Sequence, residues 1–95
     1  MKVETLVAML SHATSDPKLL PSTVVALQQA VWSSEIEGPA AAIGVLRDLA
    51  IGLDYYEPNA TWRARDRSFF GEDVALDAVR IAIAEIARLL ATASG

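Results

Sequence analysis

The chain has 95 residues, 53% of them hydrophobic, and a formal net charge of −4. A chain of this length suits one small domain that needs its apolar residues for a core, so a deep catalytic pocket is disfavoured. The absence of cysteine excludes disulfide bonds and thiolate metal sites, and a single histidine excludes imidazole clusters for zinc or iron. Magnesium or calcium bound by carboxylates stays an alternative, but the sequence has no EF-hand-like spacing, so we expect neither a metal nor a cofactor.

The acidic balance also bears on partners and location. A negative net charge disfavours direct nucleic-acid binding, which requires a basic face. Glu4 interrupts the first apolar segment and no small-residue cleavage pattern follows it, which argues against a signal peptide. No uncharged apolar run approaches the roughly 18–20 residues of a membrane span. We therefore expect a cytoplasmic protein that does not enter a membrane.

The first helix is indicated by apolar residues at helical spacing, followed by polar residues from His12 to Ser15 where the helix should end. These apolar residues are Val3, Leu6, Val7 and Leu10. Asp16 then suits an N-cap, and Pro17 suits the first position of a short helical turn.

Pro21 affects the start of the second helix, because the residue before a proline avoids helical geometry. That residue is Leu20, so the longer helix is predicted to start at Ser22 or Thr23. Its apolar stripe contains Val24, Leu27 and Val31. Gly38 is expected to close this helix in a left-handed conformation, with Pro39 in the first turn of the next.

A third helix is predicted from residue 39 to about residue 55, with Pro58 ending it. Its apolar face contains Ile43, Leu46, Ala50 and Leu53. Glycine costs about 1 kcal/mol relative to alanine inside a helix, so Gly44 and Gly52 are expected at tight helix crossings. The segment from Pro58 to Gly71 is expected to be largely irregular, with one short helical turn.

The last helix is predicted to begin at Glu72 and Asp73, whose charges favour a helix N-terminus, and to run to about Thr92. Its inner stripe contains Val79, Ile83, Ile86 and Leu90. Its outer face carries two oppositely charged pairs spaced three residues apart, Asp77 with Arg80 and Glu85 with Arg88.

The chain shows no strand-like alternation of apolar and polar residues. We predict an all-α fold, a compact four-helix bundle with an irregular aromatic-rich loop before the last helix. Residues 1–95 are expected to form a single helical domain.

The sequence lacks the motifs of phosphate-binding loops, zinc proteases and serine hydrolases. His12 has no evident nucleophile or orienting carboxylate as a catalytic partner. Residues 34–37, Ser-Glu-Ile-Glu, match a capping box, although Gly38 and Pro39 directly after them disfavour a helix start there; in either case local backbone hydrogen bonding explains them without catalysis. We predict no catalytic residues and a protein that is not an enzyme; a small carboxylate hydrolase is one alternative.

Residues 53–73 differ from the alanine- and leucine-rich sequence around them, because they combine five aromatic residues with three arginines and five acids. In one interpretation, aromatic rings pin a loop to the bundle and Arg63 or Arg65 bridges to Asp54 or Glu57. The rings are those of Tyr55, Trp62, Phe69 and Phe70. In the other, tyrosine and tryptophan anchors inside an acidic rim form a protein-binding surface. Both interpretations can hold together.

Residues 56–59, Tyr-Glu-Pro-Asn, form an aromatic–Glu–Pro–Asn element that closes a helix, followed by a polar loop and a final amphipathic helix over 71–90. In this arrangement the chain resembles colicin D-type bacterial immunity proteins. The resemblance covers roughly residues 46–90, in the C-terminal half of the chain, whereas the N-terminal half agrees only in being helical.

The resemblance implies a small acidic helical protein that protects a bacterium by occluding a toxin's basic cleft, with carboxylates in place of substrate phosphates. The toxin of the colicin D type cleaves transfer RNA. The net charge agrees with this, because an acidic domain is steered toward a cationic site. The expected partner-binding residues are Asp54, Tyr55, Tyr56, Glu57, Asp66, Glu72 and Asp73.

Among these residues Glu57 rests on the motif, and the other acids rest on proximity and charge. Arg63, Arg65 and Arg67 depart from the acidic pattern, and they either form internal salt bridges or indicate a toxin of another kind. We therefore predict a non-enzymatic immunity protein whose partner is a cognate toxin with a basic nuclease domain. The alternative is a helical structural or regulatory module, with the aromatic segment as a homodimer contact.

Overall fold

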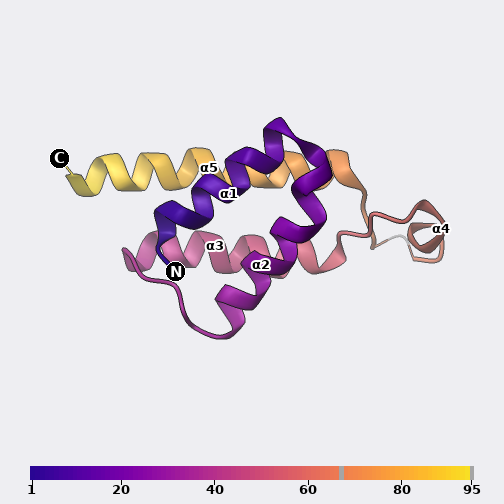
Figure 1. The fold of residues 1–95 in the computed structure, drawn as a ribbon, viewed down its shortest axis with the longest axis horizontal. Helices are drawn as coiled ribbons and strands as arrows, with labels where there is room; N and C mark the ends of the chain where they lie inside the picture. Colours follow the sequence, from indigo (N-terminus) through magenta and orange to yellow (C-terminus); the bar gives the residue numbers. More distant parts are fainter. Residues whose placement is uncertain (67, 95) are drawn as a thin grey trace.

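The computed structural model describes residues 1–66 and 68–94, with side chains described through residue 92. The described chain is all-α, with five α-helices, two 3-10 helices and no strand (Figure 1). The elements are α1 Val3–Ser15, η1 Pro17–Leu19, α2 Leu20–Trp32, α3 Ala40–Gly52, η2 Leu53–Tyr55, α4 Ala60–Arg63 and α5 Glu72–Ser94. The predicted four long helices and the short turn inside the loop are thereby confirmed.

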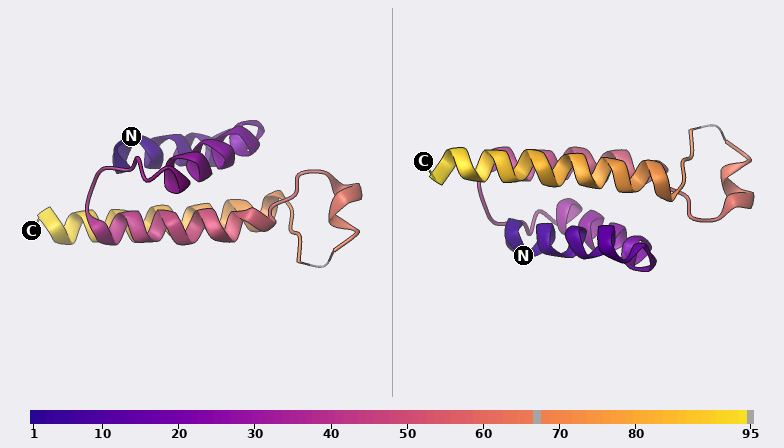
Figure 2. Two further views of the ribbon diagram at one scale, coloured as in Figure 1. Left: turned by 90° about the horizontal axis from the view of Figure 1, so that it is seen from below. Right: turned by 90° about the horizontal axis from the view of Figure 1, so that it is seen from above.

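The long helices form two layers (Figure 2). In one layer α3 and α5 lie side by side and antiparallel, and α1 and α2 lie across one face of that layer. The core fills the space between the layers, where apolar side chains from all four helices are buried. The largest of these are Leu6, Leu10, Leu20, Leu27, Leu46, Leu53 and Ile86.

The start of α2 differs from the sequence prediction. Asp16 Oδ1 accepts a hydrogen bond from the Lys18 N–H (3.4 Å), as expected of an N-cap, but α2 then begins at Leu20 and not at Ser22 or Thr23. Leu20 has helical dihedrals, φ −58° and ψ −49°, although a proline follows it. Pro21 lies in the first turn, where a missing N–H leaves no hydrogen bond unmade, and Leu20 is completely buried. Burial therefore outweighs the local preference of a residue before proline.

The end of α2 is also earlier than predicted, because Ser34 and not Gly38 takes the left-handed position, with φ 58°. The Ser34 N–H donates to the Val31 carbonyl (3.2 Å) and the Glu35 N–H to the Ala30 carbonyl (3.2 Å). This pair of bonds is the Schellman motif, which satisfies the last carbonyls of a helix. Ser34 therefore ends a helix, and the proposed capping box that would start one there is wrong.

Gly38 instead allows the N-terminus to approach the α2–α3 connection. The Val3 N–H donates to the Glu37 carbonyl (2.9 Å), and the Glu37 N–H donates to the Met1 carbonyl (2.8 Å). Gly38 has φ +153°, and a Cβ atom there would lie 2.5 Å from Val3 Cγ2. Only glycine suits both the dihedral and the close contact with the fully buried Val3.

The expectation that Gly44 and Gly52 lie at tight crossings is wrong. A Cβ atom at either position would meet no atom within 4 Å. The residues of α3 that are completely buried are Ala42, Leu46 and Ala50, and the two alanines provide the small side chains at the packed face. Gly44 and Gly52 face open space.

The last helix agrees with the prediction. It begins at Glu72 and continues to Ser94, two residues beyond the expected end. Its two predicted ion pairs form on the exposed surface, with Arg80 Nη1 3.4 Å from Asp77 Oδ1 and Arg88 Nη2 3.7 Å from Glu85 Oε1. None of the described helices has the length and apolar character needed to cross a bilayer.

Candidate functional site

The aromatic segment forms a loop that projects beyond the helices at one end of the molecule (Figures 1 and 2). Its ends are held together at a neck formed by Tyr56 and Phe70, whose rings stack at a centroid distance of 6.4 Å. The Glu57 N–H donates to the Phe70 carbonyl (2.9 Å), and the Phe70 N–H donates to the Tyr55 carbonyl (3.0 Å). A surface loop with closed ends of this kind is an Ω-loop, a frequent carrier of function. We call residues 57–69 the projecting loop.

Short-range hydrogen bonds from polar side chains shape the projecting loop. Asn59 caps α4, since its Oδ1 accepts from the N–H groups of Thr61 (2.9 Å) and Trp62 (3.4 Å). Glu57 Oε1 accepts from the Asn59 N–H (3.1 Å). Asp66 Oδ1 accepts from the Ser68 N–H (2.8 Å) further along. Asn and Asp favour such local bonds, which here satisfy the backbone N–H groups of Thr61, Trp62 and Ser68.

Two arginines of the projecting loop, Arg65 and Arg63, lie against Trp62 and Gly71 respectively. The guanidinium carbon of Arg65 lies 5.3 Å from the centroid of the Trp62 ring, a cation–π arrangement. Arg63 is half-buried, and its guanidinium lies against Gly71, where an added Cβ atom would collide with it. The ion pairs found among the described residues are Asp77–Arg80 and Glu85–Arg88, so the suggested bridges from Arg63 or Arg65 to Asp54 or Glu57 do not form. Arg67 lies outside the described residues.

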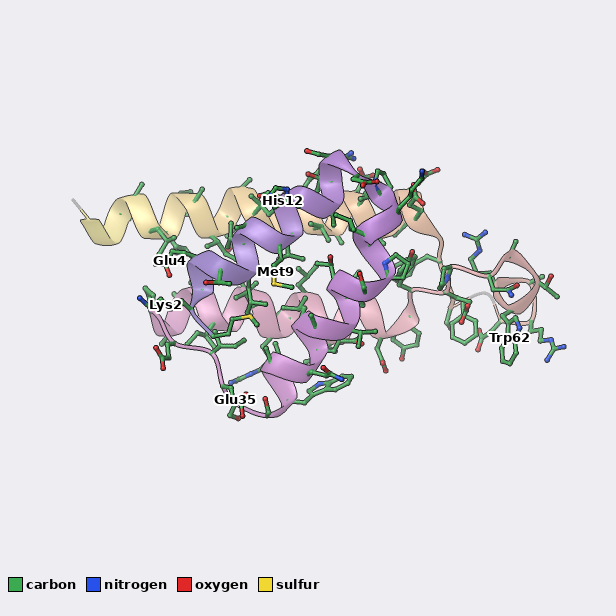
Figure 3. The ribbon with its side chains drawn as sticks, viewed as in Figure 1. Lys2, Glu4, Met9, His12, Glu35 and Trp62 are labelled. Atoms are coloured by element: carbon green, nitrogen blue, oxygen red, sulfur yellow. The ribbon has the colours of Figure 1, made fainter. Side chains whose placement is uncertain are left out.

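The aromatic side chains divide into two sets. Tyr56 and Phe70 are partly buried and pack against the hydrophobic core. Tyr55 and Trp62 have exposed fractions of 50% and 54%, so these two rings do not pin the loop to the bundle as one interpretation required. Trp62 lies on the projecting loop, well away from His12 on α1 (Figure 3). Large exposed aromatic rings are typical of protein-binding surfaces.

The structure brings together three of the predicted partner-binding residues, Tyr56, Glu57 and Glu72. Burial raises the pKa of the Tyr56 hydroxyl, and the nearby negative charge of Glu72 adds to this rise. The Arg63 charge opposes the shift and the Glu57 charge supports it, which places all of these groups around Tyr56.

The other predicted residues lie around this centre. Asp54 and Tyr55 belong to η2 at the base of the loop, and Asp54 shares a recess of about 200 Å³ with Tyr56. Asp73 lies in the exposed first turn of α5. Asp66 is separate, in the outer part of the projecting loop. The carboxylates therefore follow the base and side of the loop and do not form one compact cluster.

The structure also contains a surface groove that was not predicted from the sequence. Residues of α3 and α5 line a groove of about 390 Å³, which we call the α3–α5 groove. Its lining includes Val45, Asp48, Leu49, Ala78, Ile81 and Glu85. A signal was present, because Val45 and Ile81 widen the apolar surface of the two helices beyond their inner stripes.

Among the described residues, no group of three or more acidic or histidine side chains is arranged to hold a metal ion. The comparisons with known protein families, with curated proteins and with solved structures return no match.

Proposed function

We propose that this chain is a cytoplasmic immunity protein, which binds a cognate bacterial toxin and neutralises it without catalysis. The observation that carries the proposal is the projecting loop and its base, where the ring of Trp62 on the loop and the ring of Tyr55 at its base are exposed and Asp54, Glu72 and Asp73 are exposed around the base. The toxin class is a nuclease, cleaving transfer RNA or another nucleic acid, in keeping with the resemblance of the C-terminal half to colicin D-type immunity proteins. The carboxylates would cover the toxin's basic active-site cleft.

The charge distribution supports this mode of inhibition. The chain has a net charge of −4, which accelerates encounter with a cationic cleft and favours such a partner over an acidic one. Arg65 is stacked on Trp62 and Arg63 is half-buried against Gly71, so both cations are engaged within the loop. Asp54, Glu72 and Asp73 are exposed and negatively charged, as a phosphate-mimicking surface requires.

The exposed rings supply the second part of the proposal. Tyrosine and tryptophan dominate binding energy where they become desolvated at the centre of an interface. Trp62 sits on α4, a helical turn capped by Asn59, and its ring is already paired with Arg65. Such a pre-ordered anchor loses little side-chain freedom when a partner covers it.

The test is co-expression with the nuclease domain encoded by the adjacent reading frame, followed by co-purification and a nuclease protection assay. The wild-type chain is expected to bind the domain and protect the nucleic acid. Trp62→Ala should weaken binding by roughly 2 kcal/mol or more, as for an aromatic anchor, whereas Trp32→Ala, which removes a somewhat more exposed ring on α2, should have little effect. Absence of both binding and protection for the wild-type chain would refute the proposed function.

The carboxylates are tested separately through association kinetics. Asp54→Lys combined with Asp73→Lys should slow association and reduce its salt dependence, because both acids are exposed at the base of the loop. Glu4→Lys combined with Glu35→Lys is the matched control, with the same charge change on exposed positions of α1 and of the α2–α3 connection. Equal slowing in both double variants would show that net charge alone acts, and the assigned surface would be wrong.

A further inference from the structure

We propose that the α3–α5 groove binds the apolar face of a basic amphipathic helix from a partner protein. Phe70, at the neck of the projecting loop, lines one end of the groove, and the other lining residues belong to α3 and α5. The proposal rests on the apolar lining of the groove and on the sign of the charges in that lining, and it does not require the function assigned to the loop.

The groove offers an apolar surface on two packed helices. Its floor includes Leu49 and Ala82, which are nearly buried, and Val45 and Ala78 are half-buried beside them. Ile81 also lines the groove and leaves 68% of its surface exposed, the largest fraction among the exposed large hydrophobic residues. An apolar surface of this kind gains free energy when a partner removes it from water.

The charged residues that line the groove are both acidic, Asp48 from α3 and Glu85 from α5. Glu85 is exposed and lies 3.7 Å from Arg88, so part of its charge is balanced within α5. A second copy of this acidic chain would place like charges opposite one another in the groove, which opposes self-association there. A partner with lysine or arginine beside its apolar residues would complement both acids.

The shape of the site favours a helix as the bound element. α3 and α5 run antiparallel (Figure 1), and the groove is lined by residues 45–52 of α3 and 78–85 of α5, so it extends along both helices. On one face of the same layer, the chain's own α1 packs its apolar stripe, with Val3, Leu6 and Leu10 almost completely buried. An amphipathic helix in a groove between two helices is a common recognition mode. The lining on α3 runs from Val45 to Gly52, about 10 Å along the helix axis, so the groove would contact about two turns of a bound helix.

Gly52 provides a way to close the groove without disturbing the core. It lines the groove, has helical dihedrals of φ −62° and ψ −40°, and a Cβ atom there meets nothing within 4 Å. Gly52→Leu would therefore fill the groove while improving helix propensity. Gly44→Leu is the matched control, because Gly44 lies on the same helix, faces open space and does not line the groove.

The experiment uses a synthetic fluorescent peptide of about 14 residues, with leucine at positions i, i+3, i+4 and i+7 and lysine elsewhere. We expect fluorescence anisotropy to show saturable binding, with NMR shift changes at Val45, Ala78 and Ile81. Gly52→Leu should weaken binding at least about tenfold, and Gly44→Leu by less than about twofold. Should Gly52→Leu fail to fold, Ile81→Lys replaces it, with Val25→Lys on the exposed face of α2 as its control.

A second pair of variants tests whether the acids of the groove are required. Asp48→Asn with Glu85→Gln should weaken binding about tenfold, whereas Glu4→Gln with Asp77→Asn, which has the same net-charge change, should not. The proposal would be overturned if the two double variants lost equal binding affinity, or if the two leucine variants did. It would also be overturned if a leucine–glutamate peptide bound as tightly as the leucine–lysine peptide. Sedimentation that shows a dimer dissociated by Gly52→Leu would also overturn it, because a second copy would then occupy the groove.

Discussion

Tyr56 and Phe70, separated by the whole projecting loop in sequence, stack at 6.4 Å with an interplanar angle of 26°. Two backbone hydrogen bonds flank the pair, and both rings pack against the core. The pair therefore joins the end of the α3–η2 segment to the start of α5. The aromatic rings at the neck thus differ from those of Tyr55 and Trp62, which are about half exposed, although the Tyr55 carbonyl takes part in the neck through the backbone.

Phe70→Ala is expected to lower the free energy of unfolding by about 1–2 kcal/mol, less than for a fully buried ring because Phe70 is half-buried. Chemical denaturation measures this change. Amide hydrogen exchange at Glu57, whose N–H bonds to the Phe70 carbonyl, should accelerate as the neck opens. Trp62→Ala is the control and should change stability by less than about 0.5 kcal/mol. Equal losses from both substitutions would contradict the division into two aromatic sets.

Gly38→Ala should destabilise the protein by about 2 kcal/mol or more, because the new Cβ meets Val3 Cγ2 at 2.5 Å and the dihedral disfavours any L side chain. Gly44→Ala places the same methyl group in open space within a helix, so it should raise stability by about 0.5–1 kcal/mol. Thermal unfolding of both variants measures the difference. The interpretation of Gly38 fails if the two substitutions shift the melting temperature in the same direction.

Ser34→Gly should stabilise the protein by up to about 1 kcal/mol, because the left-handed position that closes α2 favours glycine over serine. Ser33 is the control, since it has φ −86° and its hydroxyl donates to the Gln29 carbonyl at 2.7 Å. Ser33→Gly should therefore lower stability by about 0.5–1 kcal/mol. Urea denaturation of both variants checks the opposite signs, and a loss of stability in Ser34→Gly would argue against the Schellman motif.

Because of Tyr56, the stability of the protein should depend on pH in the alkaline range. Burial and the charges of Glu72 and Glu57 raise its pKa in the folded state above the usual value of 10.0, so the neutral hydroxyl is favoured by folding. The resulting stabilisation is fully present below pH 10.0 and is lost as the pH rises through the folded-state pKa. Denaturation at increasing pH should show this fall, and Tyr56→Phe should reduce its slope. An unchanged slope in Tyr56→Phe would assign the effect to other groups.

Much of the candidate site was predictable because its features are local. Pro58, Gly71 and the acids at 72–73 indicated a loop with a helix after it, and the structure contains both. The short helical turn follows from Asn59, an N-cap residue that bonds to its own near neighbours. The roles of the aromatic residues were not predictable, since Tyr55 and Tyr56 are adjacent and equally apolar, and only packing decides which ring is covered.

The sequence by itself determined the four long helices, the start of α5 and its two surface ion pairs, because these depend on residues within about one or two helical turns of one another. Only the tertiary structure decided where α2 begins, because burial of Leu20 overrides its local preference. It also decided that Gly38 is constrained by Val3 whereas Gly44 and Gly52 are not. Tertiary packing also decided the neck between Tyr56 and Phe70 and the α3–α5 groove. Each of these features brings together residues that are distant in the chain, and their positions depend on how whole helices pack.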